Sequence, residues 1–387
     1  MIAYLDNSAT TQVSREAADK MMKTMIEDFG NPSSMHRMGV TAEKEIKEAR
    51  RTIAKTLSAK EKEIYFTSGG TEANNLAIRG IVSAQSKRGN HIITSEIEHP
   101  AVLATFEDLK KIGFRVSVIP VDEFGLLKLD VLEKELSDET ILLSIMHVNN
   151  EVGSIQPIDK IVKIARKINK GIKIHVDAVQ SYGKLPLNLK RLDIDALSIS
   201  AHKFHGPKGV GVLYLKDTTR VVPMTTGGGQ EKAIRPGTEN VPGIVGMAVA
   251  AKAIHENIGT QYKSVLNLKN KLYEGIVENI DGLKLNSLLG DQGLAYVLNV
   301  SFVGIRGEVL LHALEEEGIY VSTGSACSSN QNKSYSHVLE AMGLDTAEKE
   351  GAIRFSLSYK TTEEEIVYAI QKVVEKVKDL DQIIKGR

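Results

Sequence analysis

A lysine placed between two histidines carries the clearest chemical signal in the chain. Lys203 follows His202 directly and stands two residues before His205, and a Gly-Pro turn comes next. The apolar run at 194–199 predicts a buried strand that ends just before this group, and 209–215 predicts a second strand. A lysine amine at a strand end can hold a carbonyl cofactor as a Schiff base. The alternative is a surface lysine beside a turn, which is the commoner situation.

A glycine-containing stretch at 67–72, Thr-Ser-Gly-Gly-Thr-Glu, joins a predicted strand to a predicted helix. Glycines let the backbone approach an anion, and a helix amino terminus offers free N–H groups with a partial positive charge. Thr71 adds a hydroxyl donor. The stretch therefore predicts a phosphate site. A plain helix start is the alternative, because the stretch matches neither of the common nucleotide-binding glycine motifs.

Three further side chains suit the recognition of an aromatic ring. Asp177 ends a predicted strand and can keep a ring nitrogen protonated, and Gln180, about one turn later, can donate to a ring oxygen. His99, just before Pro100, can stack on a ring and transfer protons near neutral pH. For the aspartate and the histidine, a structural cap of a helix or turn is the simpler interpretation.

An arginine in the last quarter of the chain completes the set. The planar guanidinium of Arg354 suits a carboxylate, although most arginines near a sheet form structural ion pairs. None of these signals is specific alone. Together, a lysine, a carboxylate, a stacking face and a phosphate pocket specify pyridoxal phosphate as the ligand.

Strand and helix patterns alternate between about residues 60 and 215, which predicts βαβ units. The expected fold class is α/β, with a mostly parallel sheet covered by helices and a smaller α+β domain at the carboxyl end. Expected strands are 64–67, 91–94, 115–120, 141–146 and 172–176, and expected helices are 72–85, 101–111, 129–136 and 158–168. Ligands bind beyond the carboxyl ends of such strands, where the polar clusters fall.

The second half of the chain predicts a separate, smaller domain. A helical pattern from about 241 to 280 leads to an expected strand at 295–302, helix at 307–317, strand at 353–357 and closing helix at 361–380. The expected divisions are an amino-terminal segment at 1–15 that packs with the small domain, a large cofactor-binding domain at 16–255 and the small domain at 256–387. Small polar residues at about 322–333 predict a mobile exposed loop.

The composition argues against several classes of protein. The 387 residues include 49 basic and 49 acidic ones, so the net charge of zero gives no support for nucleic-acid or membrane binding. No apolar run approaches the ~20 residues of a membrane span, and the first residues lack the features of a secretory signal. One cysteine, Cys327, excludes an intrachain disulfide and a cysteine-built metal site within one chain. A lone cysteine fits a reducing compartment, and we expect a cytoplasmic protein.

The chain resembles the cysteine desulfurases of the NifS/IscS type, which are fold-type I pyridoxal-phosphate enzymes of the class-V aminotransferase family. The matching motifs, spread over essentially the whole chain, are Leu5–Thr11, Gly30–Ser34 with His36, Thr67–Glu72, Glu98–Pro100, Asn149–Gly153, His175–Gln180, Ser200–Lys203, Gly206–Gly209, Gly227–Glu231, Arg235–Thr238, Ser325–Ser328 and Ala352–Ser356. Two positions depart from the pattern. Gly70 replaces a common alanine and Pro236 a serine or alanine, and we expect both to have small effects on geometry.

The resemblance implies how the cofactor ring is held. Lys203 forms the Schiff base with pyridoxal 5'-phosphate, and Asp177 pairs with the pyridine nitrogen. Gln180 contacts the ring hydroxyl, while His99 stacks on the ring and transfers protons. Asn150 contacts both the cofactor and the substrate.

The resemblance also implies the remaining contacts. The phosphate is held by Gly70, Thr71, Ser200 and His202. Thr238 reaches the phosphate of the other subunit, which implies a homodimer with shared sites. Asn31 and Arg354 bind the substrate, with Arg354 contacting its carboxylate.

Cys327 is the residue that defines the implied reaction. As a thiolate it attacks the sulfur of L-cysteine, which leaves L-alanine and a persulfide on the enzyme, since a thiol is a poor nucleophile. A mobile loop is required because the sulfur must then reach an acceptor, either an iron–sulfur scaffold protein or a sulfurtransferase for tRNA or cofactor thiolation. Cys327 can also lend one transient ligand to an iron–sulfur cluster held with a partner.

Three alternatives share this scaffold. An aminotransferase or another lyase is disfavoured, because such an enzyme has no need of Cys327 in its Ser-Ala-Cys-Ser context. Selenocysteine lyase activity can accompany desulfuration, since the same chemistry activates selenium. A non-catalytic assembly platform is disfavoured by the intact set of lysine, aspartate, histidine and cysteine.

Overall fold

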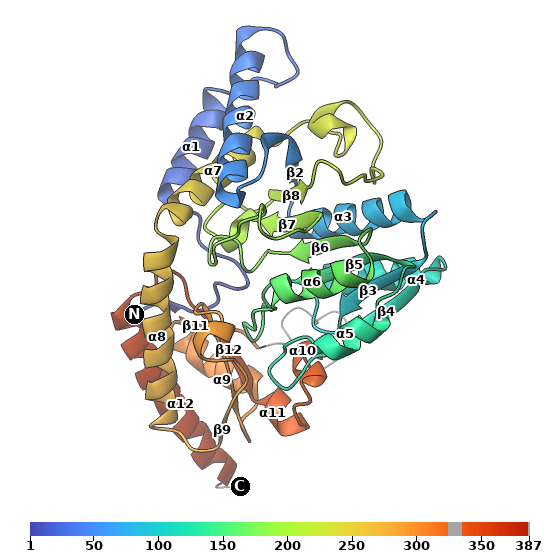
Figure 1. The fold of residues 1–387 in the computed structure, drawn as a ribbon. Coiled ribbons are helices and arrows are strands. Elements are labelled where there is room, and N and C mark those ends of the chain that lie inside the picture. Colours follow the sequence, from blue (N-terminus) through green and yellow to red (C-terminus); the bar gives the residue numbers. More distant parts are fainter. Residues whose placement is uncertain (324–334, 386–387) are drawn as a thin grey trace.

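The structure is a computed structural model that describes residues 1–323 and 335–385. Its largest element is a seven-stranded sheet with the strand order β2-β8-β7-β6-β5-β3-β4 (Figure 1). The strands are β2 (Ile64–Thr67), β3 (His91–Ser95), β4 (Arg115–Ile119), β5 (Thr140–Met146), β6 (Lys173–Asp177), β7 (Ala196–Ser200) and β8 (Gly211–Leu215). β8 runs antiparallel to both of its neighbours, and the other pairs are parallel. The prediction of a mostly parallel sheet is confirmed.

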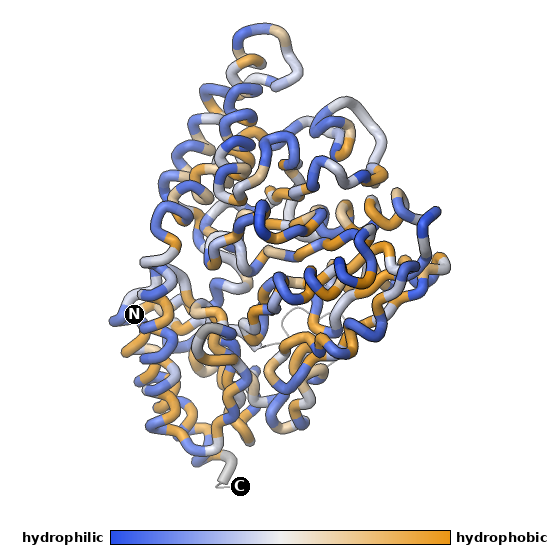
Figure 2. Tube along the Cα trace, in the orientation of Figure 1, coloured by the Kyte–Doolittle hydropathy of each residue, from blue (hydrophilic) through white to orange (hydrophobic). Residues whose placement is uncertain are grey.

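Helices cover both faces of this sheet because successive side chains of a strand point to opposite sides. In β8, Val212 and Tyr214 belong to the core that includes residues of the helices on one face. Leu213 and Leu215 belong to the core on the other face. The first face is covered by α2 (Arg37–Leu57), α6 (Ile158–Ile168) and α7 (Val241–Glu256), and the second by α3 (Gly70–Gln85) and α4 (Pro100–Lys111). Apolar stretches therefore run along the strands (Figure 2).

Two smaller sheets lie in the other half of the molecule (Figure 1). Three antiparallel strands follow the order β12-β10-β9, with β9 at Leu283–Leu285, β10 at Val297–Phe302 and β12 at Ala352–Ser356. β1 (Ala3–Tyr4) pairs in parallel with β11 (Ile319–Tyr320). The helices here are α8 (Ile258–Val277), α9 (Gly307–Glu316), α10 (His337–Ala341), α11 (Thr346–Glu350) and α12 (Glu363–Lys385). None of the helices in the described part of the chain has the length and apolarity to cross a membrane.

The amino-terminal segment joins the two halves. Asp6 bridges to Ser356 of β12, and the N–H of Asn7 donates to the carbonyl oxygen of Ser356. The N–H of Thr11, a few residues on, donates to the carbonyl oxygen of His202, just beyond the end of β7. Residues 6–11 therefore connect the small sheet with the carboxyl end of a strand in the large one.

Several predicted elements differ from those observed. The predicted helical stretch 241–280 is two helices, because Asn257 leaves the helical conformation at φ −128° and ψ 16° between α7 and α8. No element was predicted before residue 64, yet α1 (Arg15–Ile26), capped by the Ser14 side chain, and α2 precede it. The apolar spacing of Ile46, Ile53 and Leu57 in α2 is the pattern that indicates this second helix.

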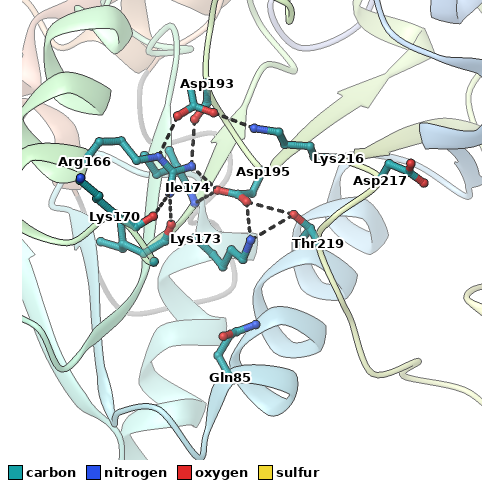
Figure 3. Close-up of polar contacts among 12 residues, drawn as sticks. Gln85, Arg166, Lys170, Lys173, Ile174, Asp193, Asp195, Lys216, Asp217 and Thr219 are labelled. Carbon is teal, nitrogen blue, oxygen red and sulfur yellow. Dashed lines mark hydrogen bonds and ion pairs between the residues drawn. The ribbon is translucent and has the colours of Figure 1, made fainter.

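A buried aspartate organises the sheet edge at which β6 and β7 begin (Figure 3). Asp195 is 2% exposed and accepts from Arg166 Nη2 at 2.6 Å and from Lys173 Nζ at 2.7 Å. Its carboxylate also accepts from the N–H of Ile174 and the hydroxyl of Thr219. This network fixes the end of α6 against the start of β6. Since β6 runs from Lys173 to Asp177, the same strand then places Asp177 at the opposite edge.

Candidate active site

A cavity of about 280 Å³ lies at the carboxyl ends of the central strands. Its walls come from the amino-terminal segment, from the first turns of α3, from the ends of β5, β6 and β7 with the segments after β3, β5, β6, β7 and β11, and from β12. The predicted site residues that line it are Gly70, Thr71, His99, Asn150, Asp177, Gln180, Ser200, His202, Lys203 and Arg354. These residues are spread over the sequence, and the fold brings them to one edge of the sheet.

Two of the predicted site residues that the structure describes do not line this cavity. Thr238 is exposed and does not line it. Asn31 is also exposed, and its side chain accepts from the N–H of Ser33 in the turn before α2. A single chain therefore provides no contact between Asn31 and the cavity. Cys327 lies outside the described residues.

Lys203 reaches the cavity from a short 3₁₀ turn, Ala201–Lys203, that directly follows β7. Its Nζ donates to the carbonyl oxygen of Ser8 at 2.6 Å and to that of Ala9 at 2.8 Å. Both carbonyl groups belong to the amino-terminal segment. The amine is thus held at the cavity by backbone that arrives from the other end of the chain.

Asp177 ends the neighbouring strand β6, and its carboxylate borders the same cavity. Oδ2 accepts from Asn74 Nδ2 at 2.6 Å, and Oδ1 accepts from the N–H of Val179 at 2.9 Å. Asn74 was not among the predicted site residues. Its spacing of three residues from Thr71 puts both on one face of α3, and this helical spacing is the signal that indicates it. The two donors fix the direction of the carboxylate.

The amino terminus of α3 forms a polar pocket with residues that follow β7. Gly69 precedes the helix and offers no side-chain cap, so the N–H groups of the first turn are available. Thr71, Ser200 and His202 add polar side chains along this wall. A Cβ atom built on Gly70 would lie 2.8 Å from Cγ2 of Val179, which explains in steric terms why glycine fits here.

His99 caps α4 and also lines the cavity. Its Nδ1 accepts from the N–H of Ala101 at 3.1 Å, so the ring proton of the neutral form resides on Nε2. Burial lowers the pKa of His99, with Asp177 opposing this effect and Lys203 adding to it. His99 is therefore a helix cap, as the simpler interpretation expected, and its ring still lies at the cavity. It leaves a neutral imidazole with Nε2–H as the donor.

Arg354 projects from β12 into the cavity with its side chain 8% exposed. Nη2 pairs with Asp6 Oδ1 at 2.7 Å, and Nη1 donates to the carbonyl oxygen of Asn150 at 3.0 Å. Its Nε is buried and has no hydrogen-bond partner within the described ranges. Asp6 was missed by the sequence analysis because the pair spans 348 residues. The guanidinium is oriented by these contacts, and further N–H donors remain for a ligand.

Glu98 lies behind the cavity wall, next to His99. Oε1 accepts from Ser95 Oγ at 2.6 Å and from the N–H of Met146 at 2.8 Å, whereas Oε2 is buried without a partner among the described residues. Burial raises the pKa of Glu98 to about 8. The carboxyl group is therefore neutral in the folded protein at physiological pH, whereas in the unfolded chain it would be ionised.

The cavity has the features that pyridoxal phosphate requires. An amine and a carboxylate face it from adjacent strands, and an uncapped helix start supplies donors for a phosphate. Ser8 Oγ and Asn74 Oδ1 are buried polar atoms at its wall that lack partners in the described chain. Buried polar atoms of this kind are normally satisfied by hydrogen bonds. A group with several polar substituents would satisfy them. No cluster of three or more His, Cys, Asp or Glu side chains suited to a metal occurs in 1–323 and 335–385.

Comparison with known proteins gives consistent matches over nearly the full length. The family described as aminotransferase class-V matches residues 3–368. The chain is 46% identical over 377 residues to cysteine desulfurase IscS of Methanosarcina thermophila, covering 97% of this chain and 92% of that protein. It is 43% identical over 385 residues to cysteine desulfurase IscS of Clostridium botulinum, covering 99% and 94%. A solved structure of a NifS-like protein superposes with a TM-score of 0.93 at 43% identity, covering 98% of this chain and 100% of that one.

The buried Glu98 predicts a specific pH dependence of stability. Its pKa of about 8 in the folded state exceeds the ordinary glutamate value of about 4.3, so the unfolded chain loses the proton first as pH rises. The stabilisation from the proton of Glu98 is present below about pH 4.3 and is lost as pH rises to about 8. Glu98→Gln cannot ionise and keeps the accepting oxygen. In the wild type we expect the free energy of unfolding to decline over this pH range by an amount on the order of a few kcal/mol, and we expect Glu98→Gln to lack this decline.

Denaturation of the cofactor-free protein over this pH range, compared between wild type and Glu98→Gln, measures the effect. Glu107→Gln, at an exposed position of α4, is the matched control and should follow the wild type. A Glu98→Gln profile that declines as steeply as the wild type would contradict a buried, neutral Glu98.

Proposed function

Because this chain belongs to the class-V aminotransferase family and is a cysteine desulfurase, we propose that the cavity binds pyridoxal 5'-phosphate on Lys203. One arrangement supports the proposal most. Asp177 ends β6, Lys203 follows the adjacent parallel strand β7, and both border the cavity. When bound, the cofactor supplies a sink for the electron pair released at the substrate Cα. The alternatives of a selenocysteine lyase and of a non-catalytic platform are not favoured.

Each wall of the cavity has its own part in holding the cofactor. Lys203 Nζ is the point of attachment, and Asp177 pairs with the ring nitrogen. Gln180 donates to the ring oxygen, and His99 covers one ring face. The phosphate is held by the first turn of α3 through Gly70 and Thr71, by Ser200 and His202, and by Thr238 of a second copy of the chain.

Arg354 and Asn150 orient the substrate. The contacts of Arg354 with Asp6 and with the Asn150 carbonyl hold the guanidinium plane, so a carboxylate in the cavity meets a pre-oriented arginine. A positioned carboxylate lets the amino group of L-cysteine face Lys203 Nζ. Asn31 is proposed as a further substrate contact.

Proton transfer is assigned to Lys203 and His99. Burial lowers the pKa of His99, so its imidazole is neutral and offers the Nε2–H group as a hydrogen-bond donor to the reacting groups. Lys203 Nζ borders the same cavity and, as a free amine, would accept the substrate Cα proton. The two groups together provide a donor and an acceptor at one site.

Sulfur transfer is assigned to Cys327. Thr323, four residues before it in the chain, lines the cavity, as does Ser322. The Cys327 thiolate attacks the substrate sulfur, an S–S bond forms and the C–S bond breaks. The electron pair of the broken bond remains with the carbon, which becomes the methyl group of L-alanine after protonation. The persulfide then passes its outer sulfur to an acceptor.

The assembly and the setting of this activity are also proposals. A homodimer is supported by the exposure of Thr238 and by its place outside the cavity of its own chain. Residues 1–15, 16–255 and 256–387 are proposed as the amino-terminal segment, the large domain and the small domain. An iron–sulfur scaffold protein or a sulfurtransferase in the cytoplasm is the proposed sulfur acceptor. Cys327 is also proposed as a transient cluster ligand with such a partner.

Cys327→Ser tests the assigned sulfur transfer. The variant should keep the cofactor colour and its change on addition of L-cysteine, because neither depends on the thiol. Sulfide and alanine formation should fall by more than about a thousandfold, since the nucleophile is missing. Absorption spectra and alanine release measure the two effects separately. Alanine and sulfide released at the wild-type rate would contradict the assignment.

Arg354→Lys tests the assigned carboxylate contact. The lysine keeps a positive charge beside Asp6 but loses the planar fork, so KM for L-cysteine should rise by about tenfold or more with a smaller change in kcat. Steady-state kinetics provide the measurement. Arg79→Lys, which alters the Arg79 pair with Asp108 on the outer face of α3 and α4, is the control and should leave KM unchanged. A KM of Arg354→Lys equal to that of the wild type would remove Arg354 from this role.

A further inference from the structure

Lys184 is a buried lysine that the mechanism above does not use. It lies at the end of the turn that follows β6, four residues after Gln180, and is 4% exposed. Its Nζ donates to Oε1 of Gln180 at 2.9 Å. The ammonium group also lies 5.8 Å from the centre of the Tyr296 ring, which comes from the small-sheet half of the chain. The lysine thus stands between Gln180 and Tyr296.

Burying this lysine is costly, and its surroundings increase the cost. Burial lowers the pKa of Lys184 to about 7, and the positive charges of Lys203 and Arg354 contribute in the same direction. Lys184 in turn helps to lower the pKa of His202 and of His205. No carboxylate of the described chain lies within ion-pair distance of Lys184. A structural ion pair therefore does not account for its position.

The contact with Gln180 determines which end of the amide faces which neighbour. Lys184 Nζ donates to the amide oxygen of Gln180, and in its ammonium form it can only donate. The opposite end, Nε2, donates to the carbonyl oxygen of Ser8 at 3.0 Å, and a carbonyl group can only accept. Rotating the amide by half a turn would set nitrogen against nitrogen and oxygen against oxygen. Lys184 and Ser8 therefore permit one orientation.

This orientation matters because Gln180 lines the cavity. The amide nitrogen carries two hydrogens, and one of them meets Ser8. The same Ser8 carbonyl accepts from Lys203 Nζ at 2.6 Å. Lys184, Gln180, Ser8 and Lys203 therefore form one continuous chain of hydrogen bonds, which places the donor end of Gln180 on the side of the attachment lysine.

We propose that Lys184 is a positioning residue: it fixes the Gln180 amide with its N–H donors directed at the cofactor ring oxygen. The inference rests on the proposed function, since it needs a cofactor held on Lys203. It assigns a role to a side chain that touches neither the cofactor nor the substrate. Without Lys184 the Gln180 amide is held only at its nitrogen end by Ser8, which weakens the donor that faces the ring oxygen.

A second buried lysine shows what a purely structural role looks like. Lys269 on α8 is 1% exposed and donates to the carbonyl oxygens of Leu288 and Leu294. Burial lowers its pKa to about 8. Lys269 does not line the cavity, and its partners are backbone groups of a loop. Lys269→Met is therefore a matched control for Lys184→Met.

The test is a pH titration of the visible absorption of the holoenzyme. The group that titrates is the nitrogen that joins Lys203 to the cofactor. Its protonated form is favoured when the ring oxygen loses a donor, and also when a neighbouring positive charge is lost. Lys184→Met should therefore raise the pH at the midpoint of the absorption change by about one unit, which is a tenfold change in proton affinity. Lys184→Gln, a smaller perturbation whose amide does not dictate the orientation of Gln180, should shift it in the same direction. Lys269→Met should lose stability and keep the wild-type midpoint.

A double variant separates the action of Lys184 through Gln180 from a direct effect of its charge. In a Gln180→Leu background, Lys184→Met should add less than about 0.3 units to the shift that Gln180→Leu already causes. Three outcomes would each overturn the inference alone. The midpoint could stay unchanged in the Lys184 variants that fold, the double variant could show the full sum of the two single shifts, or Lys269→Met could shift the midpoint as much as Lys184→Met. A colourless wild-type protein would overturn the proposed function and this inference together.

Discussion

Lys203 donates to the carbonyl oxygens of Ser8 and Ala9, and these two bonds link the large sheet to a segment that is anchored elsewhere. The next residues toward the amino terminus are held by Ser356 of β12. The position of the attachment lysine therefore depends on both sheets at once. Any relative movement of the two halves would change the surroundings of Nζ. The shape of the cavity therefore depends on the same two hydrogen bonds.

Burial sets the charge pattern around this point. It lowers the pKa of His99, and it holds the pKa of His202 and of His205 near 4, so these rings are neutral at physiological pH. Glu98 keeps its proton for the same reason. Neutral histidines offer directional hydrogen bonds without repelling the neighbouring lysines. The fixed charges of the site are then confined to a few groups that have dedicated partners.

The sequence predicted the edge of the sheet at which the site forms, because polar residues follow apolar strands at 67–72, 177–181 and 200–203. It did not predict the residues that hold the site residues in place. Asp6 contacts Arg354 across 348 positions, and such a pair leaves no local pattern. Lys184 resembles any surface lysine until its burial is known. Asn257 interrupts a helical pattern that the apolar spacing alone does not break.

The central claim is that Lys203, and no other lysine of the cavity region, carries the cofactor. Reduction of the holoenzyme with borohydride makes the attachment permanent, and mass spectrometry of the resulting peptides locates it. The account predicts the added mass of the reduced cofactor on the peptide that contains Lys203 and on no peptide that contains Lys184. Modification of Lys184, or the absence of any modified lysine in a coloured protein, would contradict it.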